Sequence, residues 1–97
     1  MNENQVEAFK PKFPLGRLVI TQGALLSLDR EDVKTAITRH LAGDWGDVDE
    51  HDRQENELSL LQGFRLLSAY KTLTGTKFWV ITEADRSSTT ILLPEEY

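Results

Sequence analysis

The apolar and polar positions of residues 17–28 predict a strand followed by a short helix. Residues 17–21 (Arg-Leu-Val-Ile-Thr) form an apolar run rich in β-branched side chains, which predicts a strand buried on both faces. Thr21 can cap a helix start, and Ala24 and Leu28 then fall on one side of a short helix.

Two longer helical patterns occupy the middle of the chain. The first begins after Asp29, an N-cap followed by an acidic turn, and apolar residues recur at helical spacing until Gly43 ends it. The second begins after Asp49, is polar on every side for two turns, and ends at Gly63. We expect this helix to lie at the surface and to dock through the apolar residues of its C-terminal half, which are Leu58, Leu60 and Leu61.

The last third of the chain has the alternating pattern of strands. Residues 64–71 alternate, residues 72–75 form a turn that contains glycine, and residues 77–82 return, which predicts a hairpin. A second polar turn at 84–88 leads into a last strand at 89–93. Phe78 and Trp79 are adjacent, so one of the two must face away from the core and needs a cover.

These patterns together predict an α+β domain. It has a three- to four-stranded, mainly antiparallel sheet with two to three helices packed on one face, in the order β-α-α-α-β-β-β. Residues 1–15 are polar and contain Pro11 and Pro14, which predicts an irregular N-terminal arm with Phe13 as an anchor. Residues 16–97 then form a single domain, in keeping with the length of the chain.

Composition and charge limit which partners the protein can bind and in which cellular compartment we expect it. The net charge of −5 argues against direct nucleic-acid binding, because basic patches usually supply that affinity. No apolar run is long enough for a membrane span and no signal-peptide pattern is present at Met1, so we expect a cytoplasmic protein without membrane contact. The chain has no cysteine, which excludes disulfides and thiolate metal sites.

The loop between the two longer helices concentrates the candidate functional residues. It and its flanks hold both histidines, Trp45 and many carboxylates; the candidate binding residues here are His40, Asp44, Trp45, Asp47, Asp49 and Glu50. Counted from Asp44, the spacing of the carboxylates does not match an EF-hand. His40 and His51 with an aspartate between them are the residue types of a two-histidine, one-carboxylate metal site, but their spacing fits no short ligand motif.

We therefore expect no metal and no cofactor. No nucleophile elbow, phosphate-binding loop or dinucleotide fingerprint is present, so the sequence favours a noncatalytic protein. Trp45, between two glycines of the loop, is either a core plug or an exposed recognition anchor, and the core interpretation is favoured. Arg86, in the polar turn near the C-terminus, is a further candidate for binding an anion or an acidic partner.

Several strings of the chain resemble a family of small bacterial proteins of unknown function, often labelled plasmid-related. The strings are residues 21–24 (Thr-Gln-Gly-Ala), 39–46 (Arg-His-Leu-Ala-Gly-Asp-Trp-Gly), 68–70 (Ser-Ala-Tyr), 81–87 (Ile-Thr-Glu-Ala-Asp-Arg-Ser) and 92–97 (Leu-Leu-Pro-Glu-Glu-Tyr). The resemblance covers roughly residues 17–97 and implies a bacterial origin on a mobile element, without a biochemical role.

The leading functional expectation is a small acidic accessory protein that acts by protein–protein interaction. Its expected surface is the Gly43–Asp49 loop with the polar half of the second long helix and the Asp85–Thr90 turn. In this mechanism Trp45 is the aromatic anchor, and the carboxylates around it meet a basic patch on the partner. A homodimer is a further expectation if the face around Trp79 is exposed. One alternative is a mobile-element anti-defence protein that presents an acidic face to a nucleic-acid-binding enzyme. Another is a metal-dependent hydrolase that uses the His40–His51 region.

Overall fold

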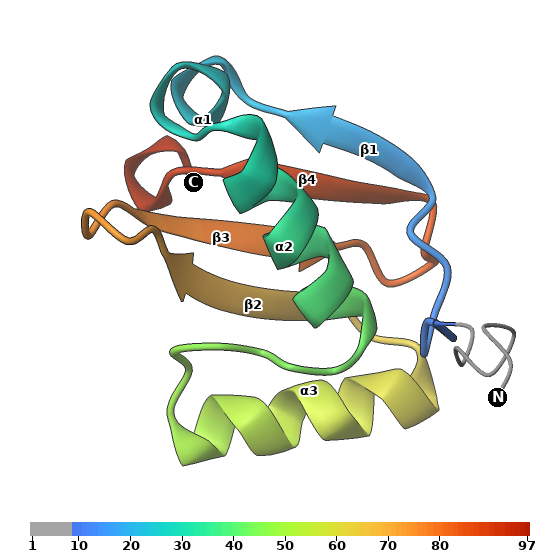
Figure 1. Ribbon diagram of the computed structural model, residues 1–97. Coiled ribbons are helices and arrows are strands. Elements are labelled where there is room, and N and C mark those ends of the chain that lie inside the picture. Colours follow the sequence, from blue (N-terminus) through green and yellow to red (C-terminus); the bar gives the residue numbers. More distant parts are fainter. Residues whose placement is uncertain (1–8) are drawn as a thin grey trace, which may run out of the picture.

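The computed structural model describes residues 9–97, and within them the predicted order of elements is confirmed. Three helices follow the first strand, three strands follow the helices, and a short 3-10 helix comes last (Figure 1). The elements are β1 (Arg17–Ile20), α1 (Gln22–Ser27), α2 (Arg30–Leu41), α3 (Glu50–Gln62), β2 (Leu66–Lys71), β3 (Lys77–Thr82), β4 (Ser88–Leu92) and η2 (Pro94–Glu96).

The four strands form one mixed sheet in the order β1-β4-β3-β2. β2 pairs with β3 and β3 with β4 in antiparallel ladders, as the hairpin patterns predict. β1 joins the outside of β4 in parallel, with Ile20 opposite Ile91. The expectation that β1 is buried on both faces is wrong, because none of its four residues is buried and Leu18 is 39% exposed at this edge of the sheet.

The predicted helix caps are all present. The side chain of Thr21 accepts a hydrogen bond from the Ala24 amide at 3.3 Å and begins α1. Asp29 forms a capping box at the start of α2, and Asp49 accepts from the amide at the third position of α3. Gly63 ends α3 in the left-handed conformation, which costs glycine little.

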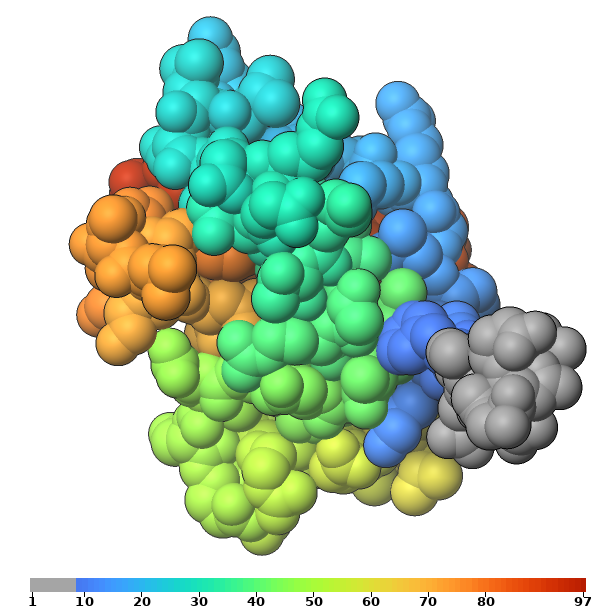
Figure 2. All heavy atoms as spheres, in the orientation of Figure 1, coloured from blue at the N-terminus to red at the C-terminus, as the bar shows by residue number. Residues whose placement is uncertain are grey.

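α2 crosses one face of the sheet and closes the main core (Figure 1). The buried residues of this core come from α1, α2 and the three C-terminal strands. They include Ala24, Ala36, Tyr70, Phe78, Val80 and Ile91. In the same view, with all atoms drawn, α2 and α3 form one surface, and the β2–β3 turn projects beside it (Figure 2).

α3 lies beyond the outer edge of β2 (Figure 1). The side-chain amide of Asn56 donates to the carbonyl of Leu67 at 2.7 Å and accepts from its N–H at 3.0 Å, so it satisfies the strand edge as a neighbouring strand would. Two residues further along β2, Ala69 forms a parallel bridge with Gly46 of the loop before α3. The edge of β2 is therefore covered by α3 and by the loop that precedes it.

The N-terminal arm packs against the body through Phe13. Residues 1–8 of the predicted arm lie outside the described residues, and residues 9–16 contain neither helix nor strand. Phe13 is 6% exposed, which confirms it as an anchor, and its ring lies 5.2 Å from the His40 ring and 6.4 Å from the Trp45 ring. The Leu15 carbonyl accepts a hydrogen bond from Thr89 at 2.7 Å.

Trp79 is the outward member of the Phe78–Trp79 pair. Phe78 is 2% exposed in the core beneath α2, and Trp79 lies on the opposite face of the sheet. Tyr97 covers Trp79 in part, with 5.6 Å between the ring centroids. Among residues 9–97, no helix has both the length and the apolar character that crossing a membrane requires.

Candidate functional site

The loop between α2 and α3 is fixed to the body by polar contacts. Asp44 receives two hydrogen bonds from the Arg39 guanidinium, at 2.7 and 3.1 Å, and this pairing lowers the pKa of Asp44. Arg39 in turn lies over the Tyr70 ring, 4.6 Å from its centroid. The Tyr70 hydroxyl donates to the Asp44 carbonyl at 2.6 Å, so Asp44 is a structural residue of the loop.

Trp45 is a core plug, as the favoured interpretation predicted. Only 3% of its surface is exposed, and it packs with Phe13, Leu41 and Leu66 in a second core cluster. Its indole N–H donates to the Glu57 carboxylate at 2.7 Å. The alternative role as an exposed anchor is wrong, because the glycines on either side let the loop fold the ring inward.

His40 lies at the centre of a buried polar network. It is fully buried; Nδ1 lies 2.6 Å from the Ser68 hydroxyl and Nε2 lies 2.9 Å from the Thr82 hydroxyl. Thr82 continues the network to Thr89 at 2.7 Å. Burial, with a smaller effect of the Arg86 charge, lowers the pKa of His40 to about 4, so the ring is neutral at pH 7.

This arrangement supports neither nucleophilic catalysis nor metal binding by His40. Ser68 is fully buried beside His40, and the second ring nitrogen meets Thr82 where a catalytic triad would have a carboxylate. Both ring nitrogens are already hydrogen-bonded, and His51 is exposed on the first turn of α3. Within residues 9–97 no group of three histidine or carboxylate side chains is placed to hold a metal ion.

Arg86 holds the end of α3 against the sheet. Its guanidinium donates to the carbonyls of Phe64 at 2.6 Å, Ser59 at 2.9 Å and Glu83 at 3.2 Å. Its backbone has a φ of 62°, and the guanidinium lies 5.7 Å from the centre of the Phe13 ring. The side chain predicted to bind an anion or an acidic partner therefore binds backbone carbonyls of its own chain.

We expect Arg86→Ala to lower the free energy of unfolding by about 2–3 kcal/mol, because three backbone carbonyls, two of them in part-buried contacts, lose charge-assisted hydrogen bonds. Arg65→Ala is the matched control, since Arg65 makes an exposed ion pair with Glu83 at 3.3 Å and should contribute less than about 1 kcal/mol. Urea denaturation of both variants measures the difference. Equal losses would show that the carbonyl contacts of Arg86 do not stabilise the fold.

The remaining candidates form a surface rather than a catalytic site. We call Asp47, Asp49, Glu50, Asp52 and Glu55 the acidic surface; all five are exposed, on the end of the loop and the first half of α3. Residues 44–57 contain seven carboxylates and one arginine, a net charge of −6 against −5 for the whole chain. The rest of the chain is therefore close to neutral, and its excess negative charge is concentrated here.

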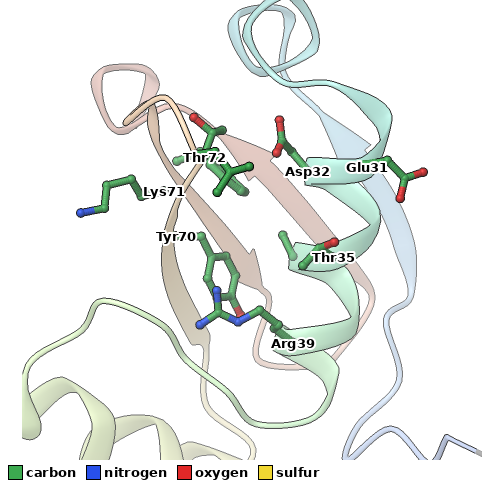
Figure 3. Close-up of a pocket in the computed structure, with 10 residues that line it drawn as sticks. Glu31, Asp32, Thr35, Arg39, Tyr70, Lys71 and Thr72 are labelled. Carbon is green, nitrogen blue, oxygen red and sulfur yellow. The ribbon is translucent and has the colours of Figure 1, made fainter.

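A hollow of about 290 Å³ lies on the front of the molecule between α2 and the β2–β3 hairpin (Figure 3). Its nearest charged groups are engaged, because Arg39 is bound to Asp44 and Asp32 belongs to the capping box of α2. Lys71 and Glu31 point away from it (Figure 3). The hollow thus offers a ligand mainly apolar surface, from Ala36, Leu73, Phe78 and the Tyr70 ring, with the hydroxyls of Thr35 and Thr72 beside it.

Comparisons with protein-family models, with curated proteins and with solved structures gave no match to this chain.

Proposed function

We propose that this protein is a noncatalytic interaction module that binds a basic surface of another protein through the acidic surface. The observation that carries the proposal is the charge segregation, with a net −6 in residues 44–57 of a chain whose total is −5. A concentrated field of one sign speeds association with an oppositely charged partner and helps to exclude wrong partners.

The carboxylates of this surface differ in how far they are neutralised. Glu50 is bound by Arg53 and Gln54, and these hydrogen bonds lower its pKa to about 2. Asp47 and Glu55 make no ion pair and no side-chain hydrogen bond with the described residues. These two carboxylates keep their charge available for lysine or arginine on a partner.

Apolar side chains adjoin the acidic surface at the other end of α3. Leu61 is 85% exposed, Phe64 is 51% exposed and Leu58 is 42% exposed. Interfaces combine an apolar centre with charges that fix orientation, and this half of α3 supplies the apolar part. The expected partner therefore has basic residues beside an apolar patch.

One specific form of the proposal is an anti-defence protein that occupies the basic groove of a nucleic-acid-binding enzyme. The same charge segregation supports it, since such grooves are lined with lysine and arginine. A duplex oligonucleotide should then release the partner from immobilised protein. Release by salt but not by the oligonucleotide would favour a basic partner of another kind.

The general proposal is tested by affinity capture from a bacterial lysate with a pair of charge-reversed variants. Glu50→Lys with Glu55→Lys removes most of the negative charge of the acidic surface, and Glu31→Lys with Glu95→Lys makes the same charge change elsewhere on exposed residues. We expect a partner to be captured by the wild type and the control pair, and lost by the first pair. Circular dichroism and melting confirm that each variant is folded.

The capture should also depend on salt, because the contacts are between exposed charges. A partner retained equally by all three proteins, or retained without change at high ionic strength, would contradict a role for the acidic surface.

A further inference from the structure

Two hollows lie side by side along β2, on the face of the sheet opposite α2. The first, of about 430 Å³, is lined by Leu67, Phe64 and the α3 residues Asp52 and Glu55. The second, of about 380 Å³, is lined by Ala69, Asp47, Trp79 and Pro94. We call the two together the β2 groove.

The floor of the β2 groove is apolar and has a regular spacing. Leu67 and Ala69 are alternate residues of β2, so their side chains point to the same face, about 6.6 Å apart along the strand. Trp79 is paired with Ala69 in the neighbouring strand and stands on the side of the groove away from α3. An apolar side chain placed over Ala69 would therefore meet the indole of Trp79 and Pro94.

The opposite side of the groove is negative. Asp52 and Glu55 line the first hollow and Asp47 lines the second, and none of the three forms an ion pair within the described chain. Two basic residues also border the groove. Arg65, at the first hollow, is bound to Tyr97 at 2.8 Å and to Glu83 at 3.3 Å. Lys77, exposed at the second hollow, forms no ion pair with the described residues, so a basic ligand side chain is favoured at the first hollow. The groove thus combines an apolar floor with carboxylates that have no cationic partner.

Resting on the proposed function, we propose that the β2 groove receives an extended peptide segment of the partner protein. The segment carries a lysine or arginine and a large apolar side chain two positions apart. The basic side chain lies over Leu67 and meets Asp52 and Glu55, and the apolar side chain lies between Ala69 and Trp79. Alternate side chains of an extended peptide are also about 6.6 Å apart, which matches the floor.

The segment binds through its side chains rather than by adding a strand to the sheet. The backbone of Leu67 is already paired with Asn56, and Ala69 is paired with the loop at Trp45 and Asp47. At the groove, the backbone groups of the β2 edge are therefore already hydrogen-bonded and cannot pair with another strand. Specificity then comes from the spacing and the charge of the ligand side chains.

The test uses two blocked peptides of equal composition and ¹⁵N-labelled protein. The first, Ac-Gly-Ser-Arg-Ser-Leu-Ser-Gly-NH2, has arginine and leucine two positions apart; the second, Ac-Gly-Ser-Ser-Arg-Leu-Ser-Gly-NH2, has them adjacent. We expect the first to bind at least about fivefold more tightly, as expected when one of two contacts is lost. It should shift the indole N–H signal of Trp79 and leave that of the buried Trp45 in place.

A matched pair of variants tests the negative side of the groove. Glu55→Gln should weaken binding of the first peptide about fivefold, and Glu31→Gln, the same change on an exposed residue of α2, should leave it unchanged. Equal binding of both peptides with shifts on α3 but none at Trp79 would overturn the groove and leave the acidic surface standing. Absence of any shift with either peptide would contradict both proposals.

Discussion

Gly46→Ala should be among the most damaging single substitutions in this protein, lowering the free energy of unfolding by about 3–5 kcal/mol. Gly46 has a φ of 77°, a conformation that costs other residues about 1–2 kcal/mol. A Cβ atom there would also overlap the carbonyl oxygen of Ala69 and the ring of Tyr70. Relief of that overlap would break the two backbone hydrogen bonds between the loop and Ala69, at 3.0 and 2.7 Å.

Gly63→Ala separates the two causes of this loss. Gly63 has nearly the same φ, 76°, but nothing lies within 4 Å of a Cβ atom built there. Its substitution should cost only about 1 kcal/mol, the conformational part alone. Urea denaturation of the two variants gives the comparison, and equal losses would show that the loop does not pack on β2 as described.

His40 should make the stability depend on pH below neutrality. Its pKa is about 4 in the folded protein and about 6.5 in the unfolded chain, so above pH 6.5 both states hold a neutral ring and its effect is constant. As the pH falls from 6.5 to 4, only the unfolded chain takes up the proton. Stability is therefore lost in this window, on the order of 3 kcal/mol in total.

The contribution of His40 is isolated by comparison with His40→Gln, whose amide does not titrate. Between pH 7.5 and 5 we expect the free energy of unfolding to fall more steeply for the wild type than for the variant. A ring signal of His40 that titrates near pH 4 in NMR spectra is the second measurement. Parallel pH curves together with a ring pKa near 6.5 would contradict the buried network.

Local signals in the sequence are sufficient to predict the order of the helices and strands and where most of them begin and end. Asp29 and Asp49 cap the helices they were expected to cap, and Gly63 ends α3, because capping depends on residues only a few positions apart. The alternation in 77–82 predicts that one of Phe78 and Trp79 faces away from the core, and the structure shows that it is Trp79. The placement of Trp45 as a plug follows from its glycine neighbours and its large apolar ring.

Contacts between distant residues could not be predicted in this way. α3 was expected to dock through its leucines, but its buried residues are Asn56 and Ser59, since it meets a strand edge whose backbone groups need polar partners. Of the three leucines, Leu60 packs against the second core cluster, and Leu58 and Leu61 are exposed. Arg86 gave no signal of its role, because the carbonyls that it binds are brought to it only by the fold.

The candidate site residues fall into two groups, those bonded within the fold and those exposed on the surface, and the sequence alone does not separate the two. His40, Asp44 and Trp45 are close in sequence to the acidic surface, but their side chains are used within the structure. Two exposed carboxylates of α3, Asp52 and Glu55, form no ion pair with the described residues, as expected for a helix that is polar on every side in its first two turns. The charge of each residue follows from the sequence, but only the fold decides which charges are paired within the protein.

We propose that this protein meets a basic partner at the acidic surface, and an NMR titration with tetralysine measures that contact. Tetralysine has the charge of the expected partner and no preferred structure to fit a particular shape. We predict amide shifts confined to residues 46–57, abolished by high salt. Shifts centred instead on the carboxylates of α2 or of the β3–β4 turn, with residues 46–57 unchanged, would contradict the claim.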